Sequence, residues 1–96
     1  MKNPLAPPVS IAYYTKQSYK LLLERAEDRE NLDDNYKDWL TKVKELQADF
    51  RRQGIKANLY EVDMEELRMW CLHKSLPNIQ SSRSQFVSEM MNRRPS

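Results

Sequence analysis

The chain has 96 residues, a net charge of +2 from 16 basic and 14 acidic side chains, one glycine and one cysteine. This length supports a single domain with one hydrophobic core and little room for a deep substrate pocket beside it. One cysteine excludes an internal disulfide, one glycine excludes glycine-rich phosphate loops, and the balanced charge gives no general attraction to polyanions.

The N-terminal segment carries three prolines within residues 1–8 and no apolar run of signal-peptide length. No stretch approaches the roughly 20 apolar residues that a membrane span needs. We therefore expect a cytoplasmic protein without a membrane partner. The expected organisation is a flexible arm over 1–8, a single compact domain over 9–92 and a frayed tail over 93–96.

Residues 9–14 alternate between apolar and other side chains, which predicts a short strand. Thr15 can cap a first amphipathic helix of about 13 residues, because its hydroxyl can accept a free backbone N–H of the first turn. The apolar positions of that helix recur at helical spacing: Tyr19, Leu22, Leu23 and Ala26. Residues 24–34 then carry six acidic and two basic side chains, which predicts an acidic turn.

A second and longer helix is predicted over roughly 35–52, with an aspartate as its cap. Its apolar face is traced by Tyr36, Trp39, Leu40, Val43, Leu46 and Phe50. Gly54 is placed to end this helix in a conformation with positive φ. Residues 55–62 read as a second strand, because β-branched, aromatic and other apolar residues recur there.

Asp63 and Glu66 have the spacing of a capping box, which predicts the start of a third helix. Its buried stripe is expected to be Met64, Leu67, Trp70 and Cys71, and Pro77 follows its end. Ser82 and Gln85 repeat the capping-box spacing and predict a short fourth helix. That helix would be lined by Phe86, Val87, Met90 and Met91.

The predicted fold is helix-dominated α+β in the order β-α-α-β-α-α. Two helices joined by a short turn usually lie antiparallel. A chain that goes down one helix and up the next would begin its second strand at the end where the first one stopped. We therefore expect a two-stranded antiparallel ribbon packed on four helices, since a bare ribbon is marginal in water.

No convergent set of reactive side chains is evident. Cys71 and His73 lie two residues apart on a helix and point about 200° away from each other, so they cannot share one metal ion. The carboxylate pairs 33–34 and 65–66 fall at helix starts, where acidic residues complement the helix dipole. The sequence predicts no catalytic residue, no cofactor, no metal ligand and no small-molecule substrate, and hence a protein that is not an enzyme.

The leading hypothesis is a small binding or regulatory module that acts through protein–protein contact or self-association. Methionine and exposed aromatic side chains adapt well to partner surfaces. The candidate contact residues are Trp39, Met69, Met90 and Met91, for which the alternative is a role in the core. The second hypothesis is nucleic-acid binding through basic side chains of the C-terminal helical pair, namely Lys74, Arg83, Arg93 and Arg94.

Two resemblances accompany these patterns. Residues 63–92 resemble the SAP-type helix–turn–helix motif of DNA-binding proteins in the spacing of Glu66-Leu67, Trp70-Cys71 and Leu76-Pro77, with Ser75 at a position where that family usually has glycine. This resemblance implies a helical pair that contacts DNA. The whole chain also resembles small uncharacterised bacterial proteins with a Tyr-Tyr-Thr opening, a Tyr-x-x-Trp-Leu helix and a Glu-Leu-x-x-Trp-Cys helix, and that resemblance implies no activity.

Overall fold

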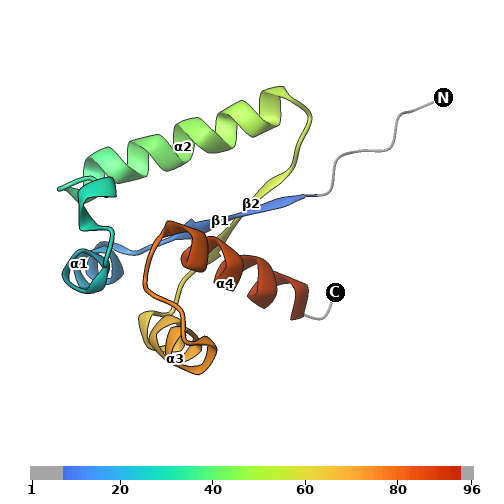
Figure 1. Ribbon diagram of the computed structural model, residues 1–96. Coiled ribbons are helices and arrows are strands. Elements are labelled where there is room, and N and C mark those ends of the chain that lie inside the picture. The colour runs from blue at the N-terminus through green and yellow to red at the C-terminus, as the bar shows by residue number, and fades with distance from the viewer. Residues whose placement is uncertain (1–7, 94–96) are drawn as a thin grey trace.

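The computed structural model describes residues 8–93. Two strands, β1 (Val9–Tyr13) and β2 (Ala57–Glu61), lie side by side among four α-helices (Figure 1). The helices are α1 (Lys16–Arg25), α2 (Tyr36–Arg52), α3 (Met64–Lys74) and α4 (Gln80–Arg93), and a 3₁₀ turn, η1 (Arg29–Asn31), lies between α1 and α2. The helix-dominated α+β class and the order of the elements match the expectation from sequence. The predicted arm and tail lie outside the described residues, except for Pro8 and Arg93.

The two strands pair in parallel, with Val9 opposite Ala57 and Tyr13 opposite Glu61. The predicted antiparallel ribbon is therefore wrong. The connection between α1 and α2 is not a short turn, because it spans residues 26–35 and includes η1. In Figure 1 α1 is seen nearly end-on while α2 runs along the strands, so α2 alone carries the chain back to the starting end of β1. A crossover of this length is what a parallel pair requires.

Three of the local signals read from the sequence have their expected geometry. The Thr15 side chain accepts the backbone N–H of Ser18, and the Asp63 side chain accepts those of Glu65 and Glu66. Gly54 follows α2 with a φ of 77°. At the start of α2, however, the capping side chain is Asn35, which accepts the backbone N–H of Asp38, and not an aspartate.

The start of α4 differs more strongly from its prediction. The helix begins at Gln80, so Ser82 lies inside its first turns and is buried instead of serving as the cap. The backbone N–H of Gln80 is instead accepted by the carboxylate of Asp28 at 2.9 Å, from a residue 52 positions away. The first N–H of α4 is thus satisfied by a distant carboxylate and not by a cap in the adjoining sequence.

The core joins the end of β1 and β2 to α1, α3 and α4. Its buried hydrophobic members include most of the predicted stripes: Tyr14, Tyr19, Leu22, Val62, Met64, Leu67, Trp70, Cys71, Phe86 and Val87. By contrast, Val43 is the one buried residue of α2, and Leu46 on the same helix is 44% exposed. The apolar face of α2 is therefore less buried than those of α1, α3 and α4.

Candidate protein-binding grooves

Met69 and Met90, two of the four predicted contact residues, lie on one open groove between α3 and α4. Met69 is 54% exposed, while Trp70 and Phe86 beneath it are buried, with ring centroids 5.6 Å apart. We call this the methionine groove, lined by Met69, Trp70, Phe86 and Met90 and having a volume of about 470 Å³. An apolar depression with a flexible methionine at its rim is suited to bind an apolar side chain of a partner.

Three carboxylates and one arginine complete the lining of the methionine groove: Asp63, Glu65, Glu66 and Arg93. Glu65 is neutralised by an ion pair with Arg68, and Arg93 by Glu89 at 3.0 Å. Within residues 8–93, no lysine or arginine is ion-paired with Asp63 or Glu66. The uncompensated charge of the groove is therefore negative.

The other two predicted contact residues lie elsewhere. Met91 is partly buried against the core and does not line the methionine groove. Trp39 belongs to an aromatic cluster on the other side of the molecule, where its ring lies 5.1 Å from that of Tyr19 and 5.4 Å from that of Tyr36. The four residues therefore do not form one surface.

Three of the four basic residues of the nucleic-acid hypothesis lie within residues 8–93, and all three are ion-paired within the chain. Arg83 is 3% exposed and forms a bidentate pair with Asp28. Lys74 and Arg93 both pair with the carboxylate of Glu89, and the Lys74 ammonium also lies 5.9 Å from the centre of the Trp70 ring. Arg94 lies outside the described residues. The structure thus brings Lys74 and Arg93 together, but around an acidic side chain.

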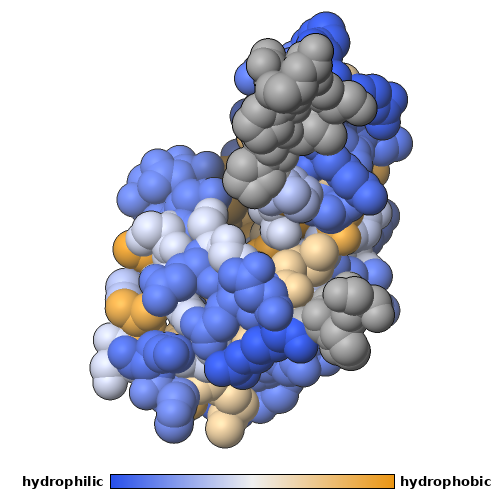
Figure 2. All heavy atoms as spheres, turned by 90° about the vertical axis from the view of Figure 1, so that its right-hand side faces the viewer, coloured by the Kyte–Doolittle hydropathy of each residue, from blue (hydrophilic) through white to orange (hydrophobic). Residues whose placement is uncertain are grey.

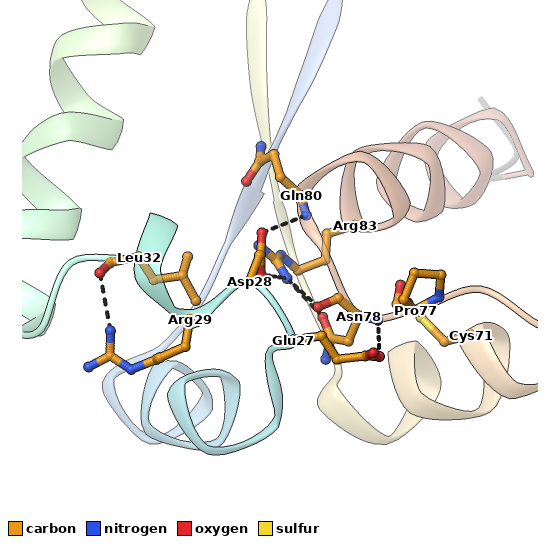
Figure 3. A network of polar contacts seen from close by, with 9 residues as sticks. All are labelled: Glu27, Asp28, Arg29, Leu32, Cys71, Pro77, Asn78, Gln80 and Arg83. Carbon is orange, nitrogen blue, oxygen red and sulfur yellow. Dashed lines mark hydrogen bonds and ion pairs between the residues drawn. The ribbon is translucent and has the colours of Figure 1, made fainter.

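Arg83 lies in a buried polar network that ties η1 to α4 (Figure 3). Its guanidinium donates to both Asp28 oxygens at 3.0 and 2.9 Å, and also to the Asn78 backbone carbonyl and side-chain oxygen. Glu27 completes the link: its backbone N–H donates to the Asn78 carbonyl and its carboxylate accepts the Asn78 N–H. Burial raises the pKa of Asp28, but the hydrogen bonds and charge of Arg83 and the N–H of Gln80 outweigh it, so the pKa lies below its ordinary value of 3.8.

This network was not predicted from the sequence, although the position of Arg83 indicates one half of it. Arg83 lies three residues before Phe86 and four before Val87, on the stripe that α4 buries. A cation on a buried stripe indicates a buried ion pair. Its partner left no such signal, because Asp28 is one of six acidic side chains in residues 24–34.

Residues 8–93 offer few other groups that could act as a nucleophile or bind a metal ion. Cys71 is buried, and its burial raises the pKa of the thiol above the ordinary value, which lowers the thiolate fraction that reacts as a nucleophile. Within the same range, no three histidine, cysteine or acidic side chains are grouped so that they could hold a metal ion. Nor does any described helix have the length and apolar character needed to cross a bilayer.

Comparison of the chain with protein-family models, with curated proteins and with solved structures found no match.

Proposed function

We propose that this protein is a small non-catalytic cytoplasmic module that binds a partner protein through the methionine groove. The observation that supports this proposal is the juxtaposition of Met69 and Met90, from two different helices, over the buried rings of Trp70 and Phe86. An exposed methionine, Met69, and a partly buried one, Met90, together with the two aromatic rings line an apolar depression that can accept the apolar face of a helix.

The negative charge of the groove defines the chemistry of the partner. A segment that inserts apolar side chains between α3 and α4 would place its flanking residues near Asp63 and Glu66, which lack basic ion-pair partners within residues 8–93. Basic side chains at those positions would meet opposite charge, whereas acidic ones would be repelled. The partner segment is therefore an amphipathic helix with one apolar face and a basic polar face.

The proposal is tested with two synthetic amphipathic peptides that share one apolar face and carry either lysine or glutamate on the polar face. Methionine methyl NMR reports the site directly, because the signals of Met69 and Met90 should shift on binding while that of buried Met64 stays in place. The lysine peptide should bind and the glutamate peptide should not. Equal binding of both peptides, or shifts outside the groove, would contradict the charge argument.

A matched pair of variants distinguishes binding at the methionine groove from nonspecific binding to exposed apolar side chains elsewhere. Met69→Lys should weaken binding of the lysine peptide by about tenfold or more, because it removes an apolar contact and places a like charge beside the basic face of the peptide. Leu72→Lys on the same helix is the control, since Leu72 is 64% exposed and does not line the groove. In affinity capture from the native host, the partner is the protein retained by the wild type and by Leu72→Lys but lost with Met69→Lys.

A further inference from the structure

A second groove follows the edge of β1 that is not paired with β2. Four consecutive residues of the strand, 9–12, line it together with Leu46 and Phe50 of α2 and Ser84 of α4, and its volume is about 350 Å³. Successive side chains of a strand point to opposite faces of the sheet. A cavity that contacts all four residues must therefore run along the edge of the strand, and we call it the edge groove.

The hydrogen bonds to β2 show which backbone groups of β1 face this groove. Val9 donates its N–H to the Lys56 carbonyl at 2.9 Å, and Tyr13 accepts the N–H of Val62 at 2.9 Å, so these two residues face β2. Because the direction alternates along a strand, the N–H and C=O groups of Ser10 and Ala12 point away from β2. The outer edge of β2 differs, since the Gln47 side chain of α2 donates to the Ala57 carbonyl there.

We propose that a second copy of this chain pairs with that edge, strand β1 against strand β1 in antiparallel orientation. A twofold axis at Ile11 would place Ser10 of each copy opposite Ala12 of the other. Each such pair exchanges two backbone hydrogen bonds, which makes four in all. The product is a four-stranded sheet in the order β2-β1-β1-β2, more stable than two separate two-stranded sheets.

Charge and hydrophobicity favour a second copy as the occupant. The groove lining contains two cations, and both are already neutralised within the chain: Lys42 by Asp33 at 2.7 Å and Arg83 by Asp28 at 2.9 Å. Two identical grooves can thus meet without repulsion, as an isologous interface requires. Leu46 of α2, 44% exposed beside the same edge, would be covered by the other copy.

Figure 2 shows a mainly hydrophilic surface, with hydrophobic residues visible in its middle and at its left and lower edges. The proposed interface is separate from the methionine groove, so the failure of one proposal leaves the other standing.

Disulfide cross-linking tests the predicted register. Ile11→Cys places two thiols on the twofold axis, in a non-hydrogen-bonded antiparallel pair whose Cα atoms lie about 4.5 Å apart, within disulfide range. We expect rapid formation of a covalent dimer on mild oxidation. Leu59→Cys is the control: Leu59 is 40% exposed on β2, away from the proposed interface, so this variant should form little covalent dimer. Cross-linking of Ile11→Cys that is no faster than that of Leu59→Cys overturns the proposal.

Sedimentation equilibrium supplies the second measurement. The wild type should be a dimer at micromolar concentration, and Ala12→Pro should weaken dimerisation about tenfold or more by removing an N–H of the free edge. Leu59→Pro, which alters the outer edge of β2, should remain a dimer. If circular dichroism shows that either proline variant is unfolded, two other variants replace the pair. Leu46→Glu should be a monomer. Leu72→Glu should be a dimer. A monomeric wild type, including one that binds extended peptides at β1, overturns the proposal.

Discussion

Asp28 and Arg83 form a bidentate ion pair between residues 55 positions apart, and both side chains are more than nine-tenths buried. Asp28 also accepts the N–H of Gln80, so one carboxylate neutralises a buried cation and caps α4. The pair joins the η1 region to the C-terminal helical pair. These links hold α4 in the position where it borders both grooves.

Breaking this pair should strongly destabilise the protein. Asp28→Ala leaves the Arg83 guanidinium buried without a counter-charge, which typically costs about 3–5 kcal/mol. Urea unfolding measures the loss. Asp34→Ala is the matched control, because the Asp34 side chain is 91% exposed and its ion pair with Arg29 should contribute less than about 1 kcal/mol. Similar losses in the two variants would contradict the assigned role of the pair.

The same pair predicts a loss of stability in acid. The pKa of Asp28 is lowered in the folded protein, so the unfolded chain binds more protons as the pH falls below about 5 and the free energy of unfolding decreases with it. The contribution is complete above the ordinary pKa of 3.8 and is lost as the pH falls through the lowered pKa. Asp28→Asn should flatten this dependence in unfolding curves measured across the acid range.

An exposed carboxyl group provides the control for the acid experiment. Arg68 also lowers the pKa of Glu65, chiefly through their hydrogen bonds, but that pair is open to solvent and is screened. Glu65→Gln should therefore leave the slope of stability against pH close to that of the wild type. If Glu65→Gln flattens the dependence of stability on pH more than Asp28→Asn does, the acid sensitivity is not due to Asp28.

Two tyrosines should respond oppositely to loss of their hydroxyl groups. The Tyr14 hydroxyl is buried and has no hydrogen-bond partner within residues 8–93, whereas that of Tyr36 donates to the Tyr14 carbonyl at 2.8 Å. Tyr14→Phe should leave stability unchanged or raise it by up to about 1 kcal/mol, because an unsatisfied polar group is removed. Tyr36→Phe should lower it by about 1 kcal/mol. Thermal and urea unfolding of the two variants tests the contrast.

Alkaline titration provides an independent check on Tyr14. Burial is the largest cause that raises its pKa from 10.0 to about 12. Because the folded state favours the neutral phenol, the associated stability is complete below pH 10 and is lost as the pH rises through about 12. Ultraviolet titration should detect one late phenolate that Tyr14→Phe lacks. The pKa of Tyr36 is also raised to about 12, and that of Tyr19 is raised above 10.0, both chiefly by burial, so Tyr14→Phe should retain the late phenolates of these two residues.

Ser75 and Gly54 both have positive φ, and stability should rise when glycine is introduced at the first and fall when it is removed from the second. Ser75 ends α3 with a φ of 57°, a conformation that costs a residue with a side chain about 1 kcal/mol, so Ser75→Gly should raise stability by about 0.5–1 kcal/mol. Gly54→Ala should lower it by about 1 kcal/mol through the backbone alone, since an added Cβ would meet no atom within 4 Å. Differential scanning calorimetry of both variants decides.

Much of the local structure could be predicted because its causes lie within a few residues. The caps formed by Thr15 and Asp63 act on N–H groups two or three residues away, and Gly54 meets a conformational requirement at its own position. The grouping of Met69 with Met90 could only be a hypothesis. Their proximity depends on how α3 and α4 pack, and the same spacing rules allowed Trp39 and Met91 to be placed with them.

The helices, the order of the elements and most of the buried stripes could be predicted from the sequence, because periodicity and capping act over one or two turns. The direction of β2 could not, since the orientation of α1 relative to α2 depends on the ten-residue connection between them. Nor could the cap of α4 be predicted, which is Asp28 and not Ser82. Both outcomes depend on contacts between distant residues, whose free energy is gained only when the whole chain is folded.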